Sequence, residues 1–200
     1  GANTIKDSTA DTAGTNGAGY KTLNVNSSTA DSTLVALDFD DVETLNVSGD
    51  AKLTITGNNS LVAVKDIVVT NTAGFDLGTA PIVKTVNFTG GAGDDSVVLS
   101  TGFEKAITMG AGNDKVTYNG PASILTGKLG SVNAGDGEDT IVMLATDAAT
   151  ASGNSVFNSS FSGFEVLSLN TVTTNIIDLD GINGVDKVKT AVATALTLNN

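Results

Sequence analysis

A six-residue segment recurs about every twenty residues along this chain, and this repeat constrains the fold more than any other feature. It reads YKTLNV at residues 20–25, VETLNV at residues 42–47 and VKDIVV at residues 64–69. Weaker copies occupy residues 83–88, 104–109, 129–134, 164–169 and 185–190. The central apolar residues are Leu23, Leu45, Ile67, Val86, Ile107, Val132, Leu167 and Val188. They are separated by steps of 22, 22, 19, 21, 25, 35 and 21 residues. A period near twenty predicts coils stacked into a parallel β-solenoid, an all-β fold.

Within each copy, apolar and polar residues alternate with the period of a β-strand. In the first copy, we expect Leu23 and Val25 to face the interior and Thr22 and Asn24 to face outward. An antiparallel sandwich also contains short, regularly spaced strands and stays open as the alternative. However, a sandwich does not require every strand to carry the same residues in the same order, so the solenoid is favoured.

Three glycine- and aspartate-rich turns follow consecutive copies of the segment. They read GGAGDD at residues 90–95, GAGND at residues 110–114 and GDGED at residues 135–139. Each turn leads directly into a β-branched stretch, and Met109 and Ala134 stand where the first turn has its leading glycine. Because each turn begins where a repeated strand ends, stacking the coils lays the three turns above one another along one edge.

Calcium is the ligand that this turn composition favours. Glycines allow the backbone to direct successive carbonyls inward, and an aspartate adds a charged oxygen. Calcium takes six to eight hard oxygen ligands, so two neighbouring turns must share one ion. Three turns leave two gaps, and Asp114 in the middle turn is predicted to serve both. The candidate metal ligands are Gly91, Gly93, Asp95, Gly110, Gly112, Asp114, Gly135, Gly137 and Asp139.

Composition limits the domain organisation and the partners. Residues 1–19 are polar and glycine-rich and are interpreted as a leader or linker, with residues 20–200 as a single solenoid domain cut from a larger protein. The net charge is −12 and all ten basic residues are lysine, which argues against nucleic acid and anionic membrane surfaces. The chain has no cysteine, and no apolar run has the length of a membrane span.

Three segments interrupt the period. Residues 119–121 (NGP) are interpreted as a loop pushed outward, and the Ser-, Ala- and Asn-rich residues 145–160 as an insertion projecting from the rod. Residues 181–196 suit either a short helix or a strand, and their similarity to the earlier copies favours a strand.

Between residues 20 and 198 the chain resembles the surface-layer proteins of Gram-negative bacteria that carry RTX repeats and are secreted by type I systems. The resemblance lies in residues 43–56 (ETLNVSGDAKLTIT), 88–96 (FTGGAGDDS), 109–114 (MGAGND) and 162–165 (SGFE, with Leu167). It implies a β-solenoid with calcium between coils, located outside the cell in a crystalline coat whose partners are other copies of the parent protein. Typical RTX repeats recur every nine residues, whereas Asp95, Asp114 and Asp139 are 19 and 25 residues apart, so fewer ions are expected.

Two other function classes compete with this structural role. β-Helices include polysaccharide-cleaving enzymes, but the chain has no histidine and no arginine, so the usual base and anion clamp are absent. The adjacent carboxylates Asp40-Asp41 and Asp94-Asp95 would face opposite sides of a strand and cannot flank one bond. No catalytic residues are therefore expected. A calcium-dependent adhesin segment, or the RTX tail of a secreted enzyme, stays open.

Overall fold

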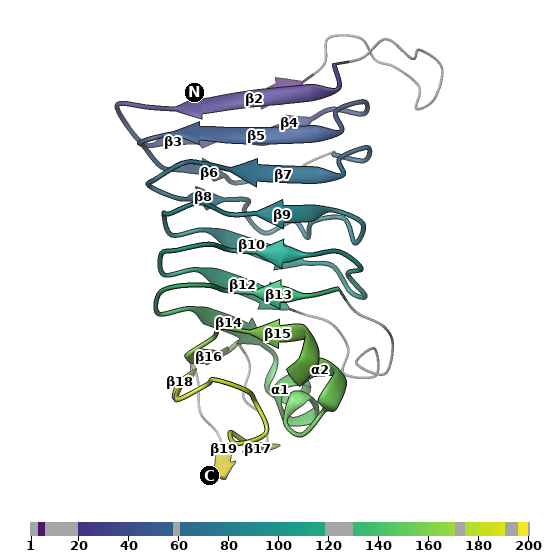
Figure 1. Ribbon diagram of the computed structural model, residues 1–200, viewed down its shortest axis with the longest axis vertical. Coiled ribbons are helices and arrows are strands. Elements are labelled where there is room, and N and C mark those ends of the chain that lie inside the picture. The colour runs from purple at the N-terminus through teal and green to yellow at the C-terminus, as the bar shows by residue number, and fades with distance from the viewer. Residues whose placement is uncertain are drawn as a thin grey trace.

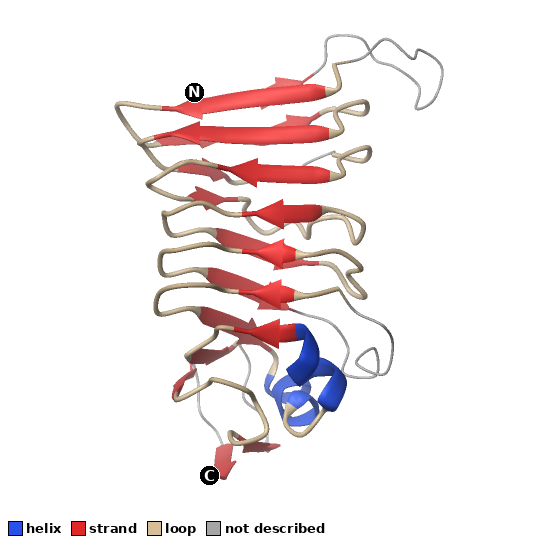
Figure 2. Ribbon diagram, viewed as in Figure 1, coloured by secondary structure: helices blue, strands red, loops and turns tan. Residues whose placement is uncertain are grey.

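The computed structural model describes residues 4–6, 20–57, 61–118, 130–170, 175–190 and 196–199, which form stacked β-coils along an elongated rod (Figure 1). The predicted β-solenoid is confirmed, because the chain alternates between two parallel sheets that pack face to face. Figure 2 shows that strands and turns make up nearly all of the rod. Buried side chains from both sheets form one continuous apolar core between them.

The seven-stranded sheet contains β2 (Thr22–Ser27), β5 (Thr44–Gly49), β7 (Asp66–Val69), β9 (Asn87–Thr89), β11 (Ile107–Thr108), β13 (Val132–Asn133) and β15 (Phe161–Ser162). The eight-stranded sheet contains β3 (Ser32–Leu34), β6 (Leu53–Ile55), β8 (Phe75–Asp76), β10 (Ser96–Leu99), β12 (Lys115–Tyr118), β14 (Thr140–Met143), β16 (Val166–Leu169) and β18 (Lys187–Thr190). Every strand pair in both sheets is parallel, as a solenoid requires.

The predicted alternation of faces is confirmed in the first strand. Val25 is buried in β2, Leu23 is partly buried against the core, and Thr22 and Asn24 are exposed. Equivalent residues pair in the next coil, where Leu23 lies opposite Leu45. The repeated segment therefore forms the seven-stranded sheet because its apolar positions stack coil upon coil.

One predicted pairing is wrong by two residues. The sequence alignment puts Val86 opposite Ile67, whereas in the structure Phe88 pairs with Ile67 and in turn with Ile107. Val86 is still buried, at the end of the preceding loop. A shift of two residues leaves the same side chains facing inward, so the alternating pattern cannot distinguish the two alignments.

The last two predicted members of this sheet belong to the other sheet. Phe161 pairs with Val132 in the seven-stranded sheet, whereas Leu167 pairs with Ile141 and Val188 with Leu167 in the eight-stranded sheet. Both sheets carry the same apolar alternation, so the pattern does not identify which sheet a segment joins.

Residues 145–160 do not project as an insertion. They form α1 (Ala145–Ala151) and α2 (Ser155–Ser160), which complete the coil between β14 and β15. Ala148 and Ala151 are buried in the core, and the Phe157 ring stacks on Phe161 with centroids 4.3 Å apart. Small alanines allow a helix to replace a strand at this position, so removing the segment would open the core.

Two small sheets lie near the ends of the described chain. Within the predicted leader, β1 (Thr4–Lys6) pairs with β4 (Ala36–Asp38), and the rest of residues 1–19 lies outside the described residues. Near the C-terminus, β17 (Asn175–Asp178) pairs with β19 (Leu196–Asn199). The strand expected within residues 181–196 is confirmed by β18, whereas the predicted loop at residues 119–121 lies outside the described residues. No helix in the described ranges is long and apolar enough to cross a membrane.

Candidate metal centre

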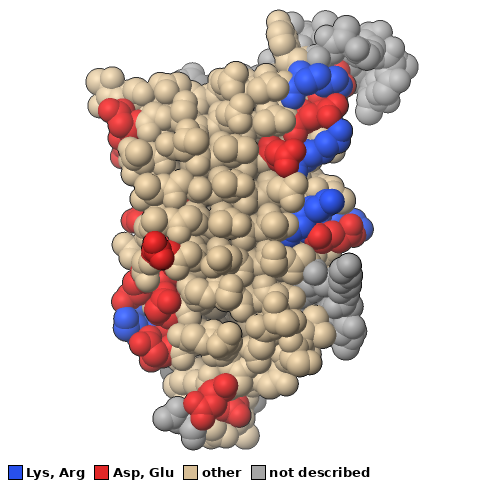
Figure 3. Space-filling view, in the orientation of Figure 1, with Lys and Arg blue, Asp and Glu red and all other residues tan. Residues whose placement is uncertain are grey.

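The three glycine- and aspartate-rich turns stack along one edge of the rod, as predicted. They connect β9 to β10, β11 to β12 and β13 to β14, and acidic side chains gather on the corresponding left edge in Figure 3. Backbone hydrogen bonds tie successive turns together: Ala111 N–H donates to the Gly91 carbonyl and Asp136 N–H to the Gly110 carbonyl, both at 2.9 Å. The turns therefore lie in direct backbone contact.

The six predicted glycines form two columns. One column contains Gly91, Gly110 and Gly135, and the other contains Gly93, Gly112 and Gly137. A Cβ on Gly135 would lie 1.9 Å from the Gly110 carbonyl oxygen, and one on Gly137 would lie 1.8 Å from that of Gly112. Both residues also have positive φ, 106° and 149°. Glycine is required here because the backbones of adjacent turns approach more closely than any side chain allows.

The three predicted aspartates form a third column, which we call the inner ladder. Asp95, Asp114 and Asp139 are at most 1% exposed. Each carboxylate reaches back to the preceding coil: Asp114 Oδ1 accepts from Asp95 N–H and Asp139 Oδ1 from Asp114 N–H, both at 2.7 Å. Glu165 continues the ladder, because its Oε2 accepts from Asp139 N–H at 2.8 Å. The nine predicted site residues are thus brought together, and Glu165 is an addition that the motif did not predict.

The inner ladder occupies a position that is apolar in the two preceding coils. Strand pairing places the following residues in one column: Leu53, Phe75, Asp95, Asp114, Asp139 and Glu165. Leu53 and Phe75 belong to the hydrophobic core, and Phe75 N–H donates to Asp95 Oδ1 at 2.7 Å. Carboxylates therefore replace core side chains, which is costly unless they bind a cation or a proton.

Two carboxylate oxygens of the ladder have no donor. Asp95 uses both oxygens, because Phe75 N–H donates to Oδ1 and Gly91 N–H to Oδ2 at 3.1 Å. By contrast, Oδ2 of Asp114 and Oδ2 of Asp139 are buried without a hydrogen-bond partner among the described residues. A cation or a proton can satisfy an unpaired buried carboxylate oxygen, and each of the two gaps between the three turns has one such oxygen.

Burial also shifts the acidity of the ladder. Desolvation raises the pKa of Asp95 to about 6 and that of Asp114 to about 7, and it raises the pKa of Asp139. The neighbouring charges of Asp95 and Asp139 add to the shift at Asp114. Without a cation, these carboxylates have a weakened tendency to ionise near neutral pH.

The expectation that Asp114 serves both gaps stays a prediction, and the directions of the three carboxylates bear on it. Its carboxylate is directed toward the Asp95 coil, through the hydrogen bond to Asp95 N–H, and so faces one gap. Asp139 faces the other gap in the same way. Asp95 faces the coil of Phe75, outside both gaps. The order of the turns in the sequence correctly places Asp114 between Asp95 and Asp139. The direction in which its carboxylate points is visible only in the three-dimensional structure.

A second column, the outer ladder, runs beside the first and was not predicted. Asp94 Oδ1 accepts from Asn113 N–H at 2.7 Å, and Asn113 Oδ1 accepts from Glu138 N–H at 3.0 Å. Its side chains reach toward the following coil, opposite in direction to the inner ladder. Glu138, the last member, pairs with Lys187, which lowers the pKa of the Glu138 carboxyl. The first two turns thus each present two side chains that bind the backbones of both neighbouring coils, whereas Glu138 of the third turn binds a lysine side chain.

The donor set of the turns fits a hard cation. Each gap contains one orphaned carboxylate oxygen and several glycine carbonyls, which are oxygen ligands of the kind calcium prefers. The carbonyls of Gly91 and Gly110 each accept one hydrogen bond and keep a second lone pair. Within the described residues, no group of three or more acidic, histidine or cysteine side chains converges on one point, so a cation held here would take most of its ligands from carbonyls.

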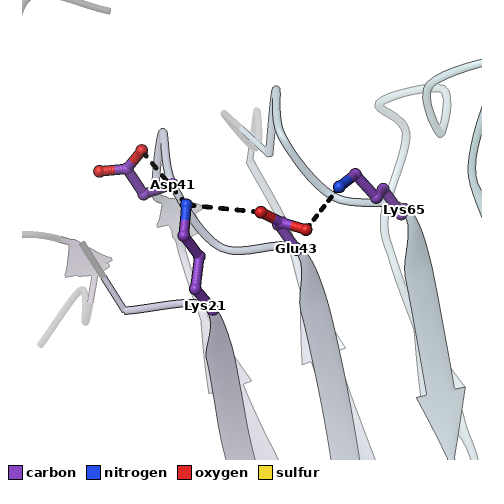
Figure 4. A network of polar contacts seen from close by, with 4 residues as sticks. All are labelled: Lys21, Asp41, Glu43 and Lys65. Atoms are coloured by element: carbon purple, nitrogen blue, oxygen red, sulfur yellow. Dashed lines mark hydrogen bonds and ion pairs between the residues drawn. The ribbon is translucent and has the colours of Figure 1, made fainter. Parts of the chain in front are cut away.

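The opposite edge of the rod differs in its charges. There, lysines and carboxylates alternate between coils (Figure 4): Lys21 lies 3.4 Å from Glu43 and 4.0 Å from Asp41, and Glu43 also pairs with Lys65. Lys84 and Glu104 form a further pair at 2.8 Å. In these exposed pairs the lysine and carboxylate charges cancel, so this edge needs no added cation, in contrast to the stacked turns.

The chain was also compared with known proteins. No protein-family model matches it, and no curated protein matches it in sequence.

Proposed function

We propose that this chain is a calcium-binding structural segment of a bacterial surface-layer protein. The observation that carries the proposal is the pair of buried, unpartnered oxygens, Asp114 Oδ2 and Asp139 Oδ2, within stacked turns rich in carbonyl oxygen. A calcium ion in each gap would satisfy one of these oxygens and cross-link two successive coils. Gly91, Gly93, Gly110, Gly112, Gly135 and Gly137 would supply backbone carbonyls beside the aspartates.

Calcium would contribute a large part of the stability. Extracellular calcium modules bind with dissociation constants of about 10⁻⁴ to 10⁻³ M. At roughly ten times the dissociation constant, each site adds about 1.4 kcal/mol to the native state, and two sites add roughly 3 kcal/mol. Folded domains are stable by only about 5 to 15 kcal/mol, so loss of calcium would weaken the rod substantially.

The resemblance of the repeats and turns to surface-layer proteins supports the structural part of the proposal. The rod presents regularly spaced coils with ordered edges, which suits a building block more than a catalyst. The net charge of −12 makes copies repel one another unless cations neutralise the acidic edge, so assembly with other copies in a lattice on the cell surface would also depend on calcium.

Calcium titration and electron microscopy together test the proposal. We expect calorimetry of this segment to give two calcium ions per chain, and the full-length protein to form two-dimensional lattices with calcium but not with chelator. A segment that binds no calcium would overturn the metal site. Calcium binding without lattices would overturn the surface-layer role and point to an adhesin segment or an enzyme tail.

A further inference from the structure

Lys187 brings a positive charge to the C-terminal end of the stacked turns. It begins β18, which lies two strands beyond β14 in the sheet, and its Nζ reaches back to Glu138 Oε2 at the end of the outer ladder. Within the described ranges, the other lysines in ion pairs are Lys21, Lys65 and Lys84, all on the opposite edge. Among the lysines that the structure describes, Lys187 is therefore the one that forms an ion pair with a residue of the stacked turns.

The turn below the third motif differs from those above it. Asn133 pairs with Ser162 and Thr140 with Val166, so three residues connect the strands of the lower coil where six connect those of the upper one. This shorter turn lacks the pair of glycines, although Glu165 still extends the inner ladder. The column of carbonyl ligands ends at this turn, but the column of carboxylates does not.

Three carboxylates at this end act on the charge of Lys187. The hydrogen bond with Glu138 raises the pKa of the Lys187 ammonium, and the charges of Asp186 and Glu165 contribute in the same direction. The pair is about half exposed, with 51% of the lysine side chain and 48% of the glutamate side chain accessible. The ammonium therefore contacts the outer ladder, and the Lys187 backbone N–H donates to the carbonyl of Glu165, in the inner ladder, at 3.0 Å.

We propose that Lys187 is the protein's own counter-ion at the end of the ladders, where it neutralises Glu138 and Glu165 in place of a further calcium ion, and that its charge opposes calcium binding in the adjacent gap. This inference rests on the proposed calcium function. The ammonium neutralises the last carboxylates where the short turn provides too few carbonyls for a further ion. Its charge also repels calcium in the adjacent gap beside Asp139. Lys187 thus stabilises the calcium-free rod and weakens calcium binding.

The variant Lys187→Met, with Lys189→Met as its control, tests the inference. Lys189 lies two residues further along β18, is exposed and has no ion pair within 4.0 Å among the described residues, although its charge also helps lower the pKa of Glu138, so it controls for loss of a nearby charge without loss of the ion pair. In chelator, we expect Lys187→Met to unfold at a lower temperature than Lys189→Met and wild type. In calorimetry, we expect one site of Lys187→Met to bind calcium about two- to fivefold more tightly, because a screened positive charge has been removed.

The unfolding temperature in chelator and the calcium affinity together distinguish three cases: a counter-ion role for Lys187, damage to the fold, and failure of the proposed calcium function. Simple damage would lower the unfolding temperature and also weaken calcium binding, which would overturn the inference. Unchanged calcium affinity in Lys187→Met, with two ions bound by wild type, would overturn the inference alone. A wild type that binds no calcium would overturn the proposed function, and the melting comparison in chelator would still decide whether Lys187 acts as a counter-ion.

Discussion

At the scale of single residues, the direction of each carboxylate decides its role. Asp95, Asp114 and Asp139 share one column and one motif, yet Asp95 has donors for both oxygens while the other two each keep an orphan. The difference arises because each side chain reaches back one coil, and only the coil before Asp95 lacks a motif turn. Equivalent residues in a repeat therefore need not have equivalent functions.

This difference predicts unequal effects of removing each charge. Asp114→Asn should lose one of two calcium ions, because the amide replaces the charged, unpartnered oxygen that faces that gap. Asp95→Asn should keep both ions, because its carboxylate contacts Phe75 and Gly91 outside the gaps. Calorimetric stoichiometry of the two variants measures this. Equal losses of calcium would contradict the assigned directions of the side chains.

The buried carboxylates also predict a pH dependence in the absence of calcium. The pKa of Asp95 is raised to about 6 and that of Asp114 to about 7 from a normal value of 3.8, so the folded state binds more protons than the unfolded state. In chelator, the free energy of unfolding should therefore fall as the pH rises from about 4 to about 7. Chemical denaturation at several pH values measures the trend. Stability that rises with pH in chelator would show that the ladder is not buried as described.

At the scale of elements, the stacked turns depend on close backbone contact, and two glycines allow a matched test. Gly135 and Gly153 both have positive φ, 106° and 77°. A Cβ at Gly135 would lie 1.9 Å from the Gly110 carbonyl oxygen, whereas one at Gly153 would have nothing within 4 Å. In chelator, Gly153→Ala should cost about 1 to 2 kcal/mol of unfolding free energy from backbone strain alone. Gly135→Ala should cost several kcal/mol, because the turn must also move.

Thermal and denaturant unfolding of the two glycine variants gives the comparison. Chelator removes any contribution of the Gly135 carbonyl to calcium binding, so the readout concerns the fold alone. Similar losses in both variants would mean that the turns can separate freely, which would contradict a rigid stack of ligands.

The helices α1 and α2 show how one element type can replace another in a coil. The long step in the repeat and the Ser-, Ala- and Asn-rich composition of residues 145–160 predict an insertion that projects from the rod. Instead, Ala145, Ala148 and Ala151 line one face of α1, and Phe157 of α2 reaches the aromatic cluster around Phe161. The spacing of three residues between the alanines fits a helical face, a signal that composition alone conceals.

At the scale of the whole molecule, the solenoid has two chemically different halves. The coils that contain β6 and β8 have apolar residues in the inner column, whereas the coils that contain β10, β12 and β14 have carboxylates. Because each coil contacts mainly its neighbours, stability in a solenoid is local. In chelator, amide hydrogens of β10, β12 and β14 should exchange faster than those of β5 and β7, and calcium should restore their protection. Uniform exchange along the rod would indicate a single cooperative unit instead.

The sequence alone determined the solenoid, the edge on which the three turns lie and the nine residues that stack there. It could do so because a period near twenty and an internal period of two are local properties of the chain. The tertiary structure alone decided the pairing of Phe88 with Ile67 and the sheet to which Leu167 belongs, because a two-residue shift or a change of sheet preserves the inward pattern. It also decided which way each carboxylate points. That direction depends on the backbone amides of another coil, about twenty residues away in sequence, and no local pattern records it.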